Sequence, residues 1–264
     1  MQPAFVDLRL AAGADAPTIA RLIQVVWPEE APAADRIARL LDIPGRATCL
    51  AVAGATVVGL TDGFATRSQA GVLRWEVDLL AVHPDYRGQG LGARLVALST
   101  EAGRARGVIL ARGLVAIANQ ASQRTFDRCG YQVEPDPLHL LVAGPFQGVN
   151  SIPVVGAGSN PIIIAEPALT IPHEGSRLFS PSAHLIPVDT LTYRGGWLEG
   201  TVTAPALVAA RAEAASRQWE RVGTLVPAAE DALIDLARLA GYVAIDVYQW
   251  WVRDLPDPQG CGSR

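Results

Sequence analysis

The feature that most constrains the fold is a glycine-rich turn between a predicted strand and a predicted helix. The turn is the run Arg87-Gly88-Gln89-Gly90-Leu91-Gly92, with the strand expected over 72–82 and the helix over 93–106. Glycine adopts backbone angles closed to other residues, so the main chain can bring its N–H groups close to a ligand. The helix adds unpaired N–H groups and the positive end of its dipole, and Arg87 adds a permanent charge. The turn therefore predicts a site for a phosphate-bearing ligand.

The spacing of the glycines shows which of the known phosphate-binding motifs this turn can match. No Lys-Ser or Lys-Thr follows the turn, which excludes the Walker pattern. A dinucleotide-binding turn needs a third glycine three residues after Gly90, where this chain has Ala93. The pattern present is Arg-x-x-Gly-x-Gly after Val82-His83-Pro84. It resembles the acyl-CoA pyrophosphate loop of the GNAT N-acetyltransferase superfamily; an ordinary strand-to-helix turn is the alternative.

The order of the predicted elements agrees with this resemblance over roughly residues 4–145. It reads strand, two helices, three strands, helix, strand, helix, strand. The strands are expected at 5–10, 47–52, 56–64, 72–82, 108–116 and 133–142, and the helices after Asp15 and at 33–41, 93–106 and 119–129. The resemblance implies an α/β (α+β) fold of the GNAT type, a mixed, mostly antiparallel central sheet flanked by helices.

The second half of the chain contains a weaker copy of the first. At a shift of 111 residues, Gly130-Tyr131 superimposes on Gly241-Tyr242, and 113–119 on 224–230. We interpret this as a diverged internal repeat, with chance similarity in an Ala- and Leu-rich chain as the alternative. The copy has Glu199-Gly200-Thr201-Val202-Thr203-Ala204 in place of the glycine-rich turn, so we do not expect it to hold pyrophosphate.

These features predict two domains. Residues 1–146 are expected to form a GNAT acyl-CoA-binding catalytic domain. Residues 147–264 are expected to form a smaller, degenerate GNAT-like domain without a pyrophosphate loop, after a linker rich in Gly, Pro, Ser and Asn at 148–160.

Composition excludes several classes of function. The net charge is −4, so no general attraction to nucleic acid is expected. Three widely spaced cysteines argue against a disulfide framework or a metal site, and we expect no metal. No signal peptide is visible, and the apolar run 152–171 is too interrupted to span a membrane. A cytoplasmic protein without a membrane partner is therefore expected.

The candidate catalytic residues are two carboxylates and a phenol. Acetyl transfer needs a neutral amine, and a lysine-like amine with a pKa of about 10.4 is almost fully protonated at neutral pH. A general base is therefore useful. Glu76, on the strand before the turn, is the first candidate because a carboxylate occupies a corresponding place in protein-acetylating GNAT members. Asp78 is the second; either could instead form a structural salt bridge, for example with Arg74.

The resemblance also implies the residues that bind acetyl-CoA, the expected co-substrate. Backbone N–H groups of the turn would hold the pyrophosphate, and the end of the preceding strand would pair with the pantetheine arm. A second contacting segment would lie at the start of the last helix, 119–129. The implied set is Leu80, Ala81, Val82, Arg87, Gly88, Gln89, Gly90, Leu91, Gly92, Ala93, Asn119, Ser122 and Phe126.

One position departs from the family pattern. Many members have a Tyr four residues before the glycine of the last helix, where its hydroxyl protonates the departing thiolate. This chain has Phe126 there, and Tyr131 is the nearest phenol, although a Tyr in that place ordinarily packs in the following strand.

The sequence thus predicts an N-acetyltransferase that moves an acetyl group from acetyl-CoA to an amine, on a small molecule or peptide, by direct attack in a ternary complex. No cysteine lies in a convincing nucleophile setting, which argues against an acyl-enzyme. A non-catalytic acetyl-CoA-binding regulatory module is the alternative. The expected assembly is a monomer with two related halves or a homodimer.

Overall fold

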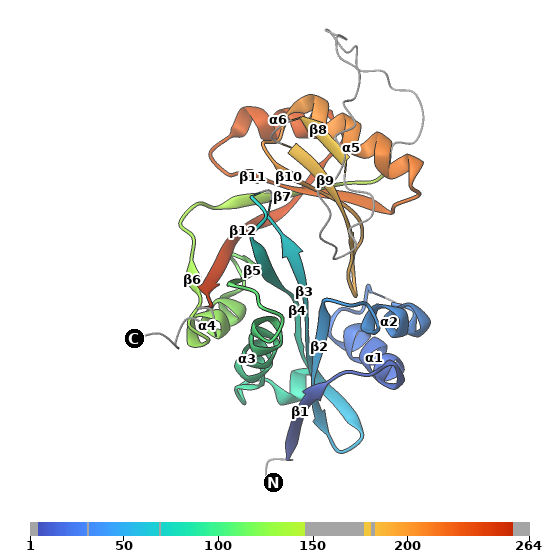
Figure 1. Cartoon of the computed structure of the whole chain (residues 1–264), viewed down its shortest axis with the longest axis vertical. Helices are drawn as coiled ribbons and strands as arrows, with labels where there is room; N and C mark the ends of the chain where they lie inside the picture. The colour runs from blue at the N-terminus through green and yellow to red at the C-terminus, as the bar shows by residue number, and fades with distance from the viewer. Residues whose placement is uncertain (1–4, 31, 69, 146–176, 181–182, 256–264) are drawn as a thin grey trace. The chain divides into compact units, whose positions relative to one another are not determined.

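The computed structural model describes residues 5–30, 32–68, 70–145, 177–180 and 183–255 (Figure 1). The chain divides into two compact units. Unit 1 contains Met1–Pro135, Thr190–Thr192 and Gln249–Arg264, and unit 2 contains Asp136–Asp189 and Tyr193–Tyr248. Among the described residues, no helix is long and apolar enough to cross a membrane.

Unit 1 has the predicted element order. Its strands are β1 (Val6–Leu10), β2 (Arg46–Ala53), β3 (Thr56–Arg67), β4 (Leu73–Val82), β5 (Leu110–Ala116) and β6 (Gln132–Val133). Its helices are η1 (Gly13–Asp15), α1 (Ala16–Val26), α2 (Ala34–Leu41), η2 (Pro84–Tyr86), α3 (Leu91–Arg104) and α4 (Gln120–Arg128). The strands β1 to β4 pair antiparallel in sequence, and β5 pairs parallel with β4. The mixed, mostly antiparallel sheet is therefore confirmed.

Helices pack around this sheet because their apolar residues repeat at helical spacing. In α1, Ile19, Leu22 and Ile23 are buried and share one cluster with Ile37 of α2 and Leu60 of β3. A separate cluster joins α3 to the strands β1, β2 and β3; its buried members are Val6, Cys49, Ala51, Val58, Leu91 and Leu95. The sheet thus has α1 and α2 in one core and α3 in another (Figure 1).

Unit 2 is a smaller α/β unit. It contains β7 (Leu138–Ala143), β8 (Arg177–Ser180), β9 (Ala183–Asp189), β10 (Arg194–Gly200), α5 (Ala204–Ser216), β11 (Arg221–Pro227), α6 (Asp231–Leu239) and the first part of β12 (Val243–Asp254). β10 pairs antiparallel with β9 and parallel with β11, as β4 does with β3 and β5 in unit 1.

The hydrogen bonds of the two units repeat at the shift of 111 residues found in the sequence. In unit 1, Tyr131 N donates to Phe126 O at 3.1 Å; in unit 2, Tyr242 N donates to Ala237 O at 2.9 Å. Gly130 and Gly241, which precede the two tyrosines, have φ of 76° and 84°. Each helix therefore ends in the same left-handed glycine turn.

The units do not coincide with the predicted division at residue 146. β7 pairs with β11 and with the first residues of β12, so it belongs to unit 2. The last residues of β12 return to unit 1, where Trp251 pairs with Val133. The single strand expected at 133–142 is two strands because Pro135 and Pro137 have no N–H to donate to a ladder. The predicted linker at 148–160 lies outside the described residues.

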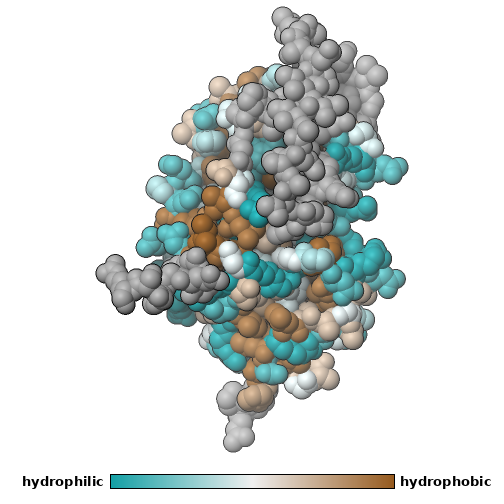
Figure 2. All heavy atoms as spheres, in the orientation of Figure 1, coloured by the Kyte–Doolittle hydropathy of each residue, from teal (hydrophilic) through white to brown (hydrophobic). Residues whose placement is uncertain are grey.

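The visible surface mixes both kinds of side chain. Figure 2 shows hydrophilic and hydrophobic residues interspersed over the face in view. Large exposed apolar side chains also occur in unit 2, where Leu239 is 75% exposed and Val243 is 63% exposed.

Candidate acyl-CoA site

The glycine-rich turn connects β4 to α3 through η2. Gly88 and Gly90 have φ of 76° and 74°, in the left-handed region that favours glycine. A Cβ atom at either position would meet open space, so the backbone angle and not crowding requires glycine there. The run 87–90 is exposed, and the Arg87 side chain donates from Nε to Val82 O at 3.1 Å. The turn is therefore open to a ligand.

The first turn of α3 has free donors at this place. No side chain caps the helix at Gly90, and the first helical bond runs from Arg94 N to Gly90 O at 3.2 Å. The N–H groups of the preceding helical residues consequently point out of the helix end. A Cβ at Gly92 would lie 3.5 Å from Thr125 of α4 and 3.7 Å from Leu80 of β4. The helices α3 and α4 and the strand β4 thus meet beside these N–H donors. Thr125 was not predicted from the sequence, because it belongs to no motif.

β4 separates from β5 next to the turn. Within the described register, the last pair between them is Glu76 with Arg112, although β4 continues to Val82 and β5 to Ala116. The expected pantetheine-contacting stretch, 80–82, lies beyond this last pair. Its main-chain groups on that side have no partner from β5 in the described residues, as the resemblance implies for a strand that pairs with a ligand.

A β-bulge in β4 lies at the same level. Across β3 and β4, Gly63 pairs with Val77 but Thr61 pairs with Leu80, so β4 has one residue more than β3 over this stretch. The extra residue falls at Asp78 and Leu79, opposite the unpaired position 62. Bulges change the direction of side chains and are frequent beside active sites.

Glu76 is held in a dense ion-pair network. It is 9% exposed and accepts from the hydroxyl of Thr66 at 2.6 Å and from Arg74 Nε at 2.8 Å. Arg112 Nε donates to its two carboxylate oxygens at 3.0 and 2.8 Å, and the Arg112 guanidinium lies 3.9 Å from the ring centre of Trp250. The structural salt bridge left open by the sequence is therefore present, and it commits both oxygens of Glu76 to hydrogen bonds.

Asp78 has a different environment. Asp78 is an exposed residue, yet nearby protein desolvates its carboxyl group. This desolvation, followed by the negative charge of Asp62, raises the pKa of Asp78 to about 7; Glu76 adds to the effect. The positive charge of Arg46 and a hydrogen bond from the Thr190 hydroxyl act in the opposite direction. Such a carboxyl group can both hold and release a proton near neutral pH.

Sequence reasoning missed the charges beneath Asp78. Asp62 is fully buried; its two oxygens accept from Arg46 Nη1 at 2.5 Å and from the Thr48 hydroxyl at 2.7 Å. Burial raises the pKa of Asp62, and Arg46 opposes this. An acidic residue in the middle of an apolar strand was the available signal, because a buried charge needs a partner.

α4 contributes the second expected contact segment. Asn119 caps the helix, with its side chain accepting from Ser122 N at 3.1 Å. Phe126 is 4% exposed and packs edge-on against Tyr131, with ring centres 5.0 Å apart. Gly113 of β5 makes room for it, since a Cβ there would lie 2.5 Å from the Phe126 ring. Phe126 is therefore a core residue rather than a surface contact.

Tyr131 is likewise a core residue. It is 2% exposed, and its hydroxyl lies 2.8 Å from that of Thr100. Burial raises its pKa to about 12. The structure gives its hydroxyl a buried partner, so it is a poor source of a proton for a departing thiolate.

The corresponding helix end in unit 2 is capped. Thr203 caps α5 by accepting from Ala206 N at 3.4 Å, and Pro205 in the first turn has no N–H. A pocket of about 590 Å³ beside this helix end includes Glu230 and Asp231. Both acidic residues repel an anion.

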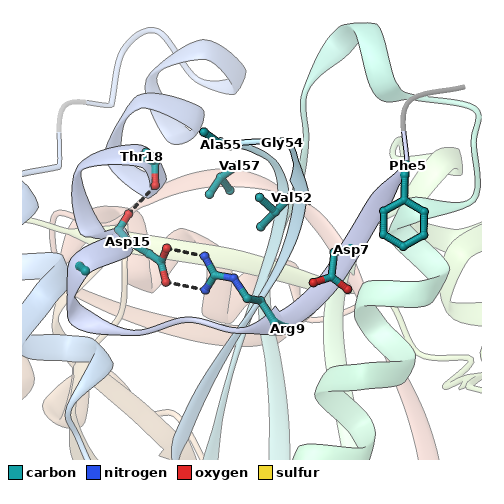
Figure 3. A pocket seen from close by; sticks show the side chains of 10 residues that line it. Phe5, Asp7, Arg9, Asp15, Thr18, Val52, Gly54, Ala55 and Val57 are labelled. Atoms are coloured by element: carbon teal, nitrogen blue, oxygen red, sulfur yellow. Dashed lines mark hydrogen bonds and ion pairs between the residues drawn. The ribbon is translucent and has the colours of Figure 1, made fainter.

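A further pocket of about 420 Å³ lies between β1, α1 and the β2–β3 turn (Figure 3). Arg9 there forms a two-bond ion pair with Asp15, at 2.7 and 2.6 Å. The Arg9 guanidinium holds the pKa of Asp15 below its usual range. Since the Arg9 guanidinium is already paired with Asp15, its positive charge is largely neutralised, and the pocket is a poor site for an anion.

The described cysteines and acidic residues do not suggest other chemistry. Burial raises the pKa of Cys49 to about 12 and also raises that of Cys129, so neither is poised as a thiolate. Within the described ranges, no group of His, Cys, Asp and Glu side chains is arranged to hold a metal ion.

The element order of unit 1 and the open turn between β4 and α3 are those expected of a GNAT domain. Residues 16–131 match the Acetyltransferase (GNAT) family, so this part of the chain is a GNAT domain. No curated protein is detectably similar to the chain in sequence.

Solved structures extend the likeness of fold to nearly the whole chain. A GCN5-related N-acetyltransferase from Sphaerobacter thermophilus covers 96% of this chain and 97% of its own, with a TM-score of 0.57 and 16% identity. A putative acetyltransferase from Pyrococcus horikoshii covers 97% of this chain and 93% of its own, with a TM-score of 0.60 and 12% identity. A tandem GNAT protein from the clavulanic acid biosynthesis pathway covers 96% of this chain and 100% of its own, with a TM-score of 0.60 and 14% identity.

Proposed function

We propose that this protein transfers an acetyl group from acetyl-CoA to an amine by direct attack in a ternary complex. The observation that carries the proposal is the contrast between the two related helix ends. The end of α3 is uncapped and follows two glycines with positive φ, whereas the end of α5 is capped by Thr203 and contains Pro205. Only the first offers N–H groups to a pyrophosphate.

The donor would lie along elements that meet at Gly92. The backbone of 88–93 would bind the pyrophosphate, and the edge of β4 at 80–82 would pair with the amides of the pantetheine arm. Asn119 and Ser122 lie on the adjacent helix start and would contact the same arm. No metal takes part in this scheme.

Asp78 is the better base of the two carboxylates. Glu76 is committed to Arg74 and Arg112, whereas Asp78 is exposed and has a pKa of about 7. In the reaction, the amine nitrogen forms a bond to the acetyl carbon and the carbon–sulfur bond breaks. Asp78 takes the proton lost by the amine, and the CoA thiolate leaves and is protonated by solvent. A thiolate is a fair leaving group, so neither Phe126 nor Tyr131 is needed as an acid.

The test is thiol release from acetyl-CoA over a panel of amines, with mass spectrometry of the acetylated products. The chain contains no lysine, so no lysine side chain of the protein itself can compete with the added amines as an acceptor. Asp78→Asn should lower turnover by roughly a hundredfold or more while acetyl-CoA still binds. Asp7→Asn, at an exposed carboxylate on β1, is the matched control and should turn over as the unaltered chain does.

A non-catalytic acetyl-CoA-binding module is the second candidate, favoured by Phe126 at the position where the family often has a Tyr. Tight binding of acetyl-CoA with no thiol released by any amine would support this module. Loss of turnover in Asp78→Asn would exclude it.

A further inference from the structure

One part of unit 1 comes from a distant place in the sequence. The turn 190–192, between β9 and β10, belongs to unit 1 although both flanking strands belong to unit 2. Leu191 is fully buried in the cluster formed by α1, α2 and the neighbouring strands. Thr190 is 2% exposed. The turn is thus part of the packed interior of unit 1.

An arginine of α2 holds the backbone of this turn. Arg36 Nη2 donates to Thr190 O at 2.6 Å, and Arg36 Nη1 donates to Leu191 O at 3.1 Å. Two charge-assisted bonds from one planar guanidinium fix both position and orientation. Because the backbone is fixed, the Thr190 side chain has a defined direction.

The Thr190 hydroxyl donates a hydrogen bond to the carboxylate of Asp78. Asp78 lies at the bulge of β4, where the regular ladder with β3 is interrupted and does not itself determine the direction of the side chain. The charged groups that act on Asp78 are Asp62 of β3, Arg46 of β2 and Glu76 of β4. Thr190 adds an uncharged hydrogen-bond donor to these charged groups.

We propose that Thr190 is a positioning residue for the catalytic carboxylate Asp78, held in place by Arg36. This inference rests on the proposed function, in which Asp78 is the base. It gives the second half of the chain a role in the reaction although its own corresponding helix end is capped. A hydroxyl that donates to the carboxylate orients one oxygen and leaves the other for the amine proton. It also stabilises the ionised form, which is the form that accepts a proton.

The test is a titration of Asp78 that needs no substrate. The side-chain carboxyl carbon of Asp78 is identified by NMR from its loss in Asp78→Asn, and its pKa is measured in three forms of the full chain. Thr190→Val removes the hydroxyl at nearly constant shape and should make Asp78 a weaker acid, by roughly threefold to tenfold. Thr190→Ser keeps the hydroxyl and should titrate as the unaltered protein does.

Turnover gives the second readout. At neutral pH, kcat of Thr190→Val should fall by several-fold and recover as the pH rises, with unchanged acetyl-CoA affinity, while Thr190→Ser retains kcat. An unshifted Asp78 titration in Thr190→Val, or an equal shift in both variants, would overturn the proposal. If Asp78 shifts as expected but no amine releases thiol from the unaltered protein, the positioning stands and the proposed function fails.

Discussion

The buried ion pair of Arg46 and Asp62 gives a prediction whose size follows from the structure. The Asp62 side chain is 0% exposed and that of Arg46 is 5% exposed. Arg46→Met keeps most of the apolar stem and leaves Asp62 with the Thr48 hydroxyl but no positive partner. Removing one member of a buried pair costs about 3–5 kcal/mol, because the other charge stays buried without compensation. We expect a loss of this size in the free energy of unfolding.

A second substitution should reverse most of this loss. Asn at position 62 has no charge and still accepts the bond from Thr48, so Arg46→Met with Asp62→Asn should be far more stable than Arg46→Met alone. Burial raises the pKa of Asp62, and the loss of Arg46 removes the opposing effect. When folding raises the pKa of a group, the folded protein becomes less stable as the pH rises. The cost of Arg46→Met should therefore be larger at about pH 8 than at about pH 5.

Urea unfolding followed by tryptophan fluorescence measures these differences, since Trp75 is fully buried in unit 1. Arg9→Met is the matched control, because the Arg9–Asp15 pair has an arginine that is 42% exposed and should contribute about 1 kcal/mol or less. An uncompensated buried charge would be ruled out if Arg46→Met cost no more than Arg9→Met, or if adding Asp62→Asn restored no stability.

Three further predictions concern the core and the base. Tyr131→Phe removes the bond to Thr100 and should cost about 1 kcal/mol in urea unfolding without changing kcat, whereas a lower kcat would restore Tyr131 as an acid candidate. Gly113→Ala brings a Cβ against Phe126 and should cost about 1–3 kcal/mol by the same assay; an unchanged unfolding curve would contradict the packing. The rate of acetyl transfer should rise with pH through about 7, as Asp78 loses its proton, and a profile flat through that range would exclude it as the base.

Much of the fold was predictable because local patterns decide it. The apolar spacing of α1 and the glycine-rich turn each point to one structure, and the shift of 111 residues identified the repeated helix, strand and helix of unit 2. The boundaries of the two units were not predictable in this way. They depend on which strand β7 and β12 pair with, and strand pairing is a long-range choice that neither strand encodes locally.

The candidate site shows the same division. The turn at 87–92 and both carboxylates of β4 were found from sequence, but their environments were not. Glu76 was ranked first from the family resemblance, with Arg74 as a possible partner. Its second partner, Arg112, lies on β5, and only the fold brings it to Glu76. Thr190 was missed because it is more than a hundred residues from Asp78 in sequence and belongs to no motif.

The open turn in the first half of the chain is expected to bind one acyl-CoA. Isothermal titration calorimetry of acetyl-CoA tests it directly, with Gly90→Val and Gly107→Val as a matched pair. Both glycines have positive φ, at 74° and 75°, and face open space, one before α3 and one after it. We predict one acetyl-CoA per chain, a loss of at least roughly tenfold in affinity for Gly90→Val, and unchanged affinity for Gly107→Val. Two equivalents per chain, or equal affinity in Gly90→Val and the unaltered protein, would exclude a single acyl-CoA site at this turn.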